Sequence, residues 1–87
     1  MATFRARVYV SLKPTVNDPQ GRTIADGLRS LGFTEVESVR AGKYIEIRLE
    51  APDSAAAQKR VDAMCDQLLA NPIIETYRFE IEAAVRA

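Results

Sequence analysis

Apolar and polar side chains alternate along residues 3–12, close to the N-terminus. The apolar positions of this run share one parity, and they are Phe4, Ala6, Val8, Val10 and Leu12. A period of two residues is typical of a β-strand with one buried face, so the sequence predicts a strand here. Lys13-Pro14 ends the strand, because proline has no N–H to donate to a neighbouring strand.

Residues 33–50 are also predicted to be extended, in two unequal parts. The first part, residues 33–39, is weakly patterned, and a strand there requires a bulge. Ala41-Gly42 is predicted to turn the chain, and the alternation beyond it is clean. The inward side chains of this second part are Ile45, Ile47 and Leu49. A hairpin is favoured over one long bent strand.

A first helix is predicted between these extended segments. Asp18 is a good N-cap, and Pro19 fits the first helical position, where a missing N–H costs nothing. Gly32 ends the helix, and the apolar residues at helical spacing before it are Ile24, Leu28 and Leu31. Gly21 and Gly27 lie on the same side of this helix. They indicate either close packing on a sheet or a surface where a partner backbone docks.

A second helix is predicted to begin at Asp53 or Ser54 and to end at Asn71-Pro72. One apolar face is formed by Ala57, Val61, Met64, Cys65 and Leu68. Residues 73–82 alternate again and form the last predicted strand, after which the final residues are expected to fray. The order is therefore β-α-β-β-α-β. This order predicts an α+β two-layer sandwich of the ferredoxin-like (split βαβ) type, an antiparallel sheet with two helices on one face, as a single domain over residues 1–87.

The composition excludes several classes of function. Twelve Lys and Arg balance twelve Asp and Glu, whereas a nucleic-acid binder normally carries a basic surplus. The chain has no histidine and one cysteine, so it lacks the usual general base and the commonest metal ligand. We therefore expect no catalytic, cofactor or metal site in this chain. The absence of a long apolar run or signal peptide and the single Cys65 favour a cytoplasmic protein with no membrane partner.

The small size of the chain favours self-association. A domain of 87 residues buries only about 60–65% of the surface of its unfolded chain, and this one has no disulfide or metal to reinforce it. The outward parity of the strands carries Arg5, Arg7, Tyr9, Tyr44, Glu46, Arg48, Glu50, Arg78, Glu80 and Glu82. This face is either a solvated surface with weak ion pairs or a self-associating one. We expect a homodimer or a higher homo-oligomer.

Several short segments in one order carry a resemblance to a known family. They are L-K-P at 12–14, N-D-P-Q-G at 17–21, L-R-S-L-G-F at 28–33, V-R-A-G-K at 39–43 and M-C-D-Q-L-L-A-N-P-I-I-E-T-Y at 64–77. Together they resemble the PurS family, the small subunit of phosphoribosylformylglycinamidine (FGAM) synthase, over nearly the whole chain.

The resemblance implies an accessory role in the fourth step of de novo purine biosynthesis. In that step formylglycinamide ribonucleotide, ATP and glutamine yield the amidine. A large PurL subunit holds ATP, with its magnesium, and the ribonucleotide, and a PurQ glutaminase releases ammonia. PurS bridges the two as a dimer. The resemblance therefore implies a ligase complex with glutamine as amido donor, in which this chain is not itself catalytic.

The resemblance also suggests residues for partner contacts, each with a plain structural alternative. The candidates are Asp18, Pro19, Gln20, Gly21, Arg40, Gly42, Lys43, Asn71, Pro72 and Glu75. Asp18, Pro19 and Gln20 are equally well explained as the start of a helix. Asn71 and Pro72 are equally well explained as the end of one. Arg40 and Lys43 flank an exposed turn that is either solvated or in contact with a phosphate or partner carboxylate. Cys65 is interpreted as a core residue.

Other functions share this order of elements. A free-standing ligand-sensing module of the ACT type is the main alternative, although its glycine-bearing turn is replaced here by Lys13-Pro14-Thr15-Val16. An acylphosphatase would need a glycine-rich phosphate loop at that place. An RNA-recognition module would need stacking aromatics on the central strands.

Overall fold

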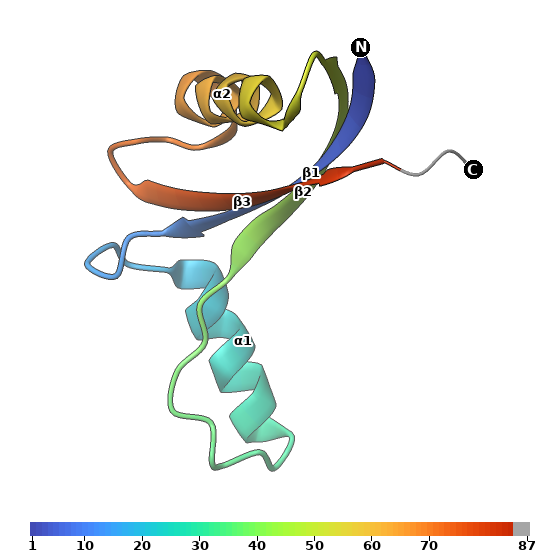
Figure 1. Ribbon diagram of the computed structural model, residues 1–87. Coiled ribbons are helices and arrows are strands. Elements are labelled where there is room, and N and C mark those ends of the chain that lie inside the picture. Colours follow the sequence, from blue (N-terminus) through green and yellow to red (C-terminus); the bar gives the residue numbers. More distant parts are fainter. Residues whose placement is uncertain (85–87) are drawn as a thin grey trace.

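The structure, a computed structural model, describes residues 1–84. The elements follow in the order β1 (Ala2–Leu12), α1 (Pro19–Ser30), β2 (Gly42–Ala51), α2 (Ser54–Met64) and β3 (Glu75–Ala83). A π-helical turn, Cys65–Leu69, extends α2. The α+β class is confirmed (Figure 1). The fraying expected at the C-terminus concerns residues outside the described range.

The strands form one antiparallel sheet with β1 in the centre, in the order β2-β1-β3. Val8 of β1 lies opposite Ile45 of β2 and Phe79 of β3. The inward parity of β1 is the predicted one, and Ala6, Val8 and Val10 are 0–2% exposed. The alternating pattern thus correctly identified both the strand and its buried face.

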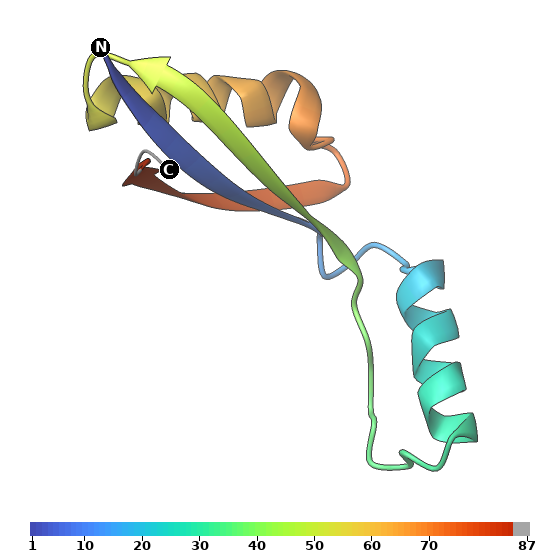
Figure 2. The ribbon, with the colours of Figure 1, turned by 90° about the vertical axis from the view of Figure 1, so that its right-hand side faces the viewer.

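Helix α2 packs across the inward face of this sheet (Figures 1 and 2). Asp53 caps it by accepting a hydrogen bond from the Ala56 N–H at 2.8 Å, as the sequence predicted. Val61 and Cys65 are fully buried, which confirms Cys65 as a core residue. On the β3 side, the Tyr77 hydroxyl donates to Asp62 Oδ1 at 2.6 Å. This bond, with burial, raises the pKa of Tyr77 to about 12.

The prediction for Leu68 is wrong, and the π-helical turn explains why. The Ala70 N–H donates to the Cys65 carbonyl at 3.0 Å, so this turn holds one residue more than an α-helical turn. The extra residue shifts the phase of the side chains. Leu69 consequently packs on the core, while Leu68 is 83% exposed.

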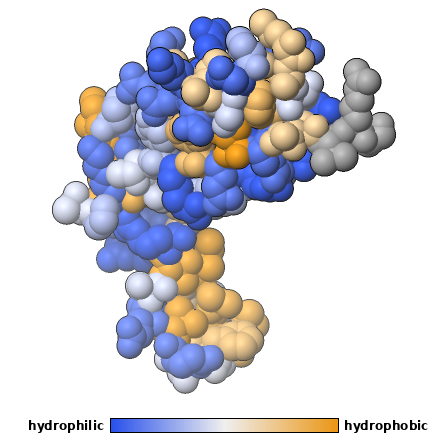
Figure 3. All heavy atoms as spheres, in the orientation of Figure 1, coloured by the Kyte–Doolittle hydropathy of each residue, from blue (hydrophilic) through white to orange (hydrophobic). Residues whose placement is uncertain are grey.

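Helix α1 projects away from the sheet instead of packing on it (Figures 1 and 2). We call α1 and the return segment that follows it, residues 19–41 together, the arm. The chain measures 51 × 33 × 15 Å, and its radius of gyration is 16.7 Å, against about 12 Å for a compact domain of this length. The prediction that both helices cover one face of the sheet is therefore wrong for α1. Apolar side chains gather on the surface of the arm (Figure 3).

The predicted strand over residues 33–39 is not formed. Residues 35–41 run without a partner strand along α1 and lead directly into β2, so there is no hairpin at Ala41-Gly42 (Figure 2). The Arg29 side chain occupies two of the carbonyls that a strand partner would need. Its Nε donates to Val36 O at 3.0 Å and its Nη2 to Glu37 O at 2.7 Å. Two carbonyls of this segment therefore accept from an arginine, and its Ala41 N–H donates to Asp18 Oδ2.

Candidate functional site

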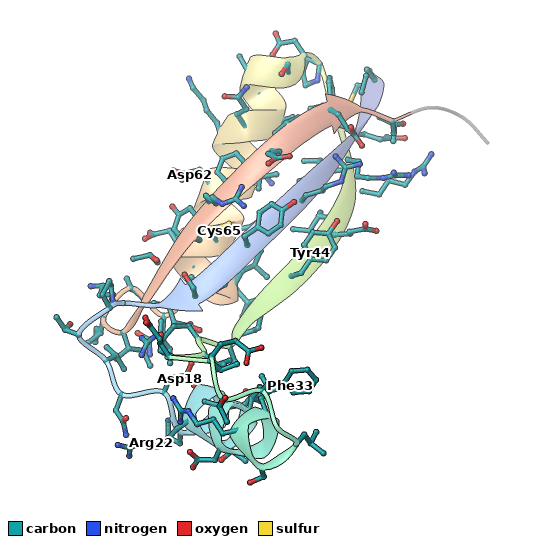
Figure 4. The ribbon with its side chains drawn as sticks, turned by 90° about the horizontal axis from the view of Figure 1, so that it is seen from below. Asp18, Arg22, Phe33, Tyr44, Asp62 and Cys65 are labelled. Atoms are coloured by element: carbon teal, nitrogen blue, oxygen red, sulfur yellow. The ribbon has the colours of Figure 1, made fainter. Side chains whose placement is uncertain are left out.

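The arm joins the sheet through two neighbouring segments, residues 13–18 and 38–43, which we call the neck. Asp18 lies between them (Figure 4). Its Oδ1 accepts from the Gly21 N–H at 2.9 Å, which caps α1 as predicted, and its Oδ2 accepts from the Ala41 N–H at 2.7 Å. Asp18 is 7% exposed. One carboxylate therefore ties the start of the arm to its end.

The same hydrogen bonds set the charge state of Asp18. The N–H groups of Gly21 and then Ala41 hold the pKa of the Asp18 carboxyl below its ordinary value, with a smaller contribution from the positive charge of Arg40. Asp18 is therefore ionised near neutral pH. A charged acceptor makes stronger hydrogen bonds than a neutral one. The two hydrogen bonds that Asp18 accepts are therefore strongest when its carboxylate is ionised.

Arg40 closes the other side of the neck. Its Nη2 donates to Lys13 O and to Val16 O, both at 2.9 Å. These bonds hold the loop after β1 against the segment that enters β2. The Arg40 guanidinium therefore donates hydrogen bonds to backbone carbonyls of its own chain. Its suggested contact with a phosphate or a partner carboxylate stays a prediction.

Two glycines allow the backbones of the neck to approach closely. A Cβ on Gly21 would overlap the Val39 carbonyl oxygen, and one on Gly42 would lie 2.5 Å from the Val10 carbonyl oxygen. Real Cβ atoms do not come that near. Gly21 thus packs closely, but on the return segment of the arm and not on the sheet. Gly27, the second glycine of α1, faces open space.

The remaining candidates lie around the same end of the sheet. Lys43 Nζ is 3.7 Å from Glu75 Oε2, and Glu75 Oε1 accepts from the Asn71 N–H at 2.7 Å. Pro72 follows in the turn that Asn71 stabilises by accepting from the Ile73 N–H at 3.0 Å. Pro19 and Gln20 are exposed at the start of α1. The structure therefore brings all ten candidate residues to the neck and its rim.

A shallow cavity of about 180 Å³ lies at this rim. Its lining includes five of the candidates, namely Asp18, Gln20, Gly42, Lys43 and Glu75. The side chains of Lys43 and Glu75 are 58% and 13% exposed. The rim therefore offers one accessible cation beside a partly buried carboxylate, a pattern suited to a polar protein contact.

The described residues offer neither a metal-binding cluster nor an exposed thiol. Residues 1–84 contain no group of three or more His, Cys, Asp or Glu side chains placed to hold a metal ion. Burial raises the pKa of the Cys65 thiol, which makes it a poor nucleophile. Over the same range no helix is long and apolar enough to span a membrane. The contacts found at the neck are hydrogen bonds that position the arm relative to the sheet.

The outward face of the sheet holds a polar and aromatic cluster. Tyr9 and Tyr44 lie with ring centroids 5.2 Å apart, and the Arg78 guanidinium carbon lies 4.0 Å from the Tyr9 ring centroid. Arg7 lies opposite Glu46 on β2 and Glu80 on β3, and its Nη2 is 2.7 Å from the diagonally placed Glu82 Oε1. Arg5, in contrast, lies opposite Arg48 on the β2 side.

The apolar face of the arm is exposed, whereas the sequence left open whether this side of α1 packs on the sheet or docks a partner. Ile24 is 41% exposed, Leu31 76% and Phe33 49%. The helical spacing of Ile24, Leu28 and Leu31 correctly indicated an amphipathic helix. Periodicity shows which side of a helix is apolar, but not which surface will cover it.

A three-stranded antiparallel sheet with α2 on one face, and an arm fastened to it by hydrogen bonds at the neck, defines a small α+β protein. Residues 5–83 match the PurS family, described as phosphoribosylformylglycinamidine (FGAM) synthase. The chain belongs to the PurS family.

Relatives and solved structures agree with this assignment. The chain is 54% identical to the phosphoribosylformylglycinamidine synthase subunit PurS of Synechocystis over 81 residues, covering 93% of this chain and 81% of the relative. It is 45% identical to the PurS subunit of Bacillus subtilis over 82 residues, covering 94% and 96%. The structure of B. subtilis PurS matches with a TM-score of 0.82 at 46% identity, over 91% of this chain and 98% of that one. A chain in the structure of PurLQS from Thermotoga maritima matches with a TM-score of 0.87 at 33% identity, over 94% and 100%.

Proposed function

We propose that this chain is the non-catalytic PurS subunit of FGAM synthase and joins a PurL synthetase subunit to a PurQ glutaminase subunit. The observation that carries the proposal is the family match over residues 5–83. The matching T. maritima structure is one of PurL, PurQ and PurS together, which supports the choice of partners. The ligase reaction, with glutamine as amido donor, belongs to the complex. An ACT-type sensing module has no comparable support.

The chemistry of the reaction is assigned to the partners. We place ATP, its Mg²⁺ and the ribonucleotide on PurL and glutamine on PurQ, and we propose that this chain binds none of them by itself. The absence of a nucleophile–base pair among the described residues supports this division. The proposal also places the protein in the cytoplasm, the reducing compartment that suits a single cysteine.

The proposed subunit is a homodimer. The support comes from the arm, whose apolar residues Ile24, Leu31 and Phe33 remain exposed in a single chain. Soluble monomers rarely leave several large apolar side chains together in water, and such patches mark contact surfaces. The projection of the arm away from the sheet, which gives the chain a radius of gyration of 16.7 Å, supports the same conclusion.

Reconstitution of the complex tests the proposal. PurL and PurQ from the same organism, mixed without this chain, are expected to give little glutamine-dependent formation of the amidine. Adding the chain should restore the reaction, because the glutaminase then works next to the synthetase. The chain alone should show no glutaminase or ATPase activity. Equal amidine synthesis with and without the chain would show that the assignment is wrong.

The rim of the neck is proposed as a partner contact. Lys43→Ala and Gln20→Ala are expected to weaken binding to PurL or PurQ, and a lost charged hydrogen bond of about 2 kcal/mol corresponds to about a thirtyfold change in affinity. Both side chains are exposed, so the thermal melts should match that of the parent. Lys59→Ala, an exposed lysine on α2, is the matched control and should bind like the parent. If Lys43→Ala binds as tightly as Lys59→Ala, the contact lies elsewhere.

A further inference from the structure

A pocket of about 320 Å³ lies between α1 and the return segment of the arm. Its lining includes three arginines, Arg22, Arg29 and Arg40. Arg22 lies on the side of α1 opposite Phe33 (Figure 4), so the pocket is separate from the exposed apolar face of the arm. The pocket also adjoins the cavity at the rim of the neck, because Asp18 lines both.

Two of the three arginines donate hydrogen bonds to the backbone of their own chain. Arg29 donates to the Val36 and Glu37 carbonyls, which fixes the return segment against α1. Its Nη1 also lies 3.4 Å from Asp26 Oδ1. Arg40 donates through Nη2 alone, so its Nε and Nη1 hydrogens have no protein acceptor within residues 1–84. The walls of the pocket are therefore held in place before any ligand binds, which lowers the entropic cost of binding.

The third arginine, Arg22, is exposed and makes no hydrogen bond or ion pair within the described part of the chain. The acidic side chains of the lining do not neutralise it. Both oxygens of Asp18 accept backbone N–H groups, and Asp26 pairs with Arg29. No ion pair within residues 1–84 joins Arg22 to Glu37 either. A guanidinium presents its N–H donors as a planar fork that fits the two oxygens of a carboxylate, and Arg22 offers this fork unused.

We propose that the pocket receives a carboxylate side chain of the partner subunit that also contacts the rim of the neck. The carboxylate accepts from Arg22 in a bidentate pair and from the free N–H groups of Arg40. The inference rests on the proposed function and adds a second contact to the one proposed for Lys43 and Gln20. Because Asp18 forms a wall of both cavities, one partner surface can reach the two of them.

The charges of the pocket favour a partner side chain over a free anion. The three arginines of the lining face three carboxylates, those of Asp18, Asp26 and Glu37, so the lining carries no net charge. A free phosphate gains little long-range attraction from such a site. A carboxylate on a subunit that is already docked at the rim has a high effective concentration near Arg22, so it does not need that attraction.

Substitutions of Arg22 test the pocket. Arg22→Ala is expected to weaken binding to the PurL and PurQ subunits by about thirtyfold, the effect of one lost charged hydrogen bond. Arg22→Lys keeps the charge without the planar fork, so its affinity should fall between those of the parent and Arg22→Ala. Arg22→Glu should bind most weakly, because it repels the carboxylate. Titration of the fluorescently labelled chain with the two subunits from the same organism measures each affinity.

The controls address folding and surface charge. Arg60→Ala removes an exposed arginine from α2 and should bind like the parent. The Arg22 variants should melt like the parent, since Arg22 makes no hydrogen bond within residues 1–84. Arg40 is left unchanged, because its bonds to the Lys13 and Val16 carbonyls hold the neck. If Arg22→Ala is unstable, Arg22→Lys provides the comparison.

The other outcomes separate this inference from the proposed function. If the parent binds both subunits and restores amidine synthesis while every Arg22 variant binds as tightly as Arg60→Ala, only the inference is wrong. If calorimetric titration shows that the parent alone binds inorganic phosphate and Arg22→Ala does not, the ligand is a free anion and the partner carboxylate is wrong. A parent that neither binds the subunits nor restores synthesis would contradict the proposed function, and the inference with it.

Discussion

Gly21→Ala is expected to lower the free energy of unfolding by about 2–3 kcal/mol, the usual range for overpacking a tight site. For a domain of this size that corresponds to a fall of about 10–20 °C in the melting temperature. The reason is the neck, where a Cβ on Gly21 would overlap the Val39 carbonyl oxygen and lie 2.7 Å from Asp18 Oδ2. Backbone cannot move aside as the end of a long side chain does. Thermal unfolding followed by circular dichroism at one protein concentration measures the effect.

Gly27→Ala is the matched control in the same helix. Gly27 has no heavy atom within 4 Å of the position of an added Cβ, so only helix propensity changes. Alanine is favoured over glycine inside a helix by about 1 kcal/mol, which predicts a higher melting temperature. The two substitutions are chemically identical and should act in opposite directions. If Gly21→Ala melts with the parent, the neck is not tightly packed and the arm is not rigidly held.

The second large effect is expected from Asp18→Asn, and it depends on pH. The pKa of Asp18 is lowered in the folded chain, so its stabilising contribution is present above the unfolded carboxyl pKa of about 3.9 and is lost as the pH falls through the folded pKa. The variant should therefore melt well below the parent at pH 7. As the pH falls below about 4, the difference should shrink, because the parent loses the same charge.

A second measurement locates the effect of Asp18→Asn in the neck. The Ala41 N–H donates to Asp18 Oδ2 at 2.7 Å, and its hydrogen exchange should accelerate in the variant. Asp53→Asn is the control, because Asp53 caps α2 at an exposed position without joining two segments. Its effect should be smaller and confined to the start of α2. A difference between parent and Asp18→Asn that does not change with pH would contradict the role assigned to the ionised carboxylate.

The sequence was most informative where the structure depends on local patterns. Alternation identified β1 and its buried parity, and the caps at Asp18 and Asp53 are formed as predicted. These features depend on neighbours within a few residues, so a local sequence pattern is enough to predict them. The clustering of the ten candidate residues at one end of the sheet follows from their place at the ends of elements.

The errors concern contacts between distant segments. The strand predicted over residues 33–39 is replaced by a turn, in which the Val36 N–H donates to the Phe33 carbonyl, and by a segment whose Val36 and Glu37 carbonyls accept from Arg29. Alternation does not encode which partner satisfies a carbonyl. Likewise, the spacing of Ile24 and Leu31 gives α1 an apolar face without saying that the neck would hold it away from the sheet. The inward turn of Arg40 was missed for the same reason, since its acceptors lie 24 and 27 residues earlier.

The central position of β1 has a consequence for synthesis on the ribosome. Strand β1 pairs with β3, which is made more than sixty residues later, with Phe4 opposite Ala83 and Leu12 opposite Glu75. Contacts between such distant residues are slow to form, because a long loop must close before they contribute. The apolar row of β1 therefore stays without its β3 neighbours until β3 has left the exit tunnel. We expect the nascent chain to be able to pair β1 with β2 earlier, and to complete its core only once β3 has joined the other edge of β1.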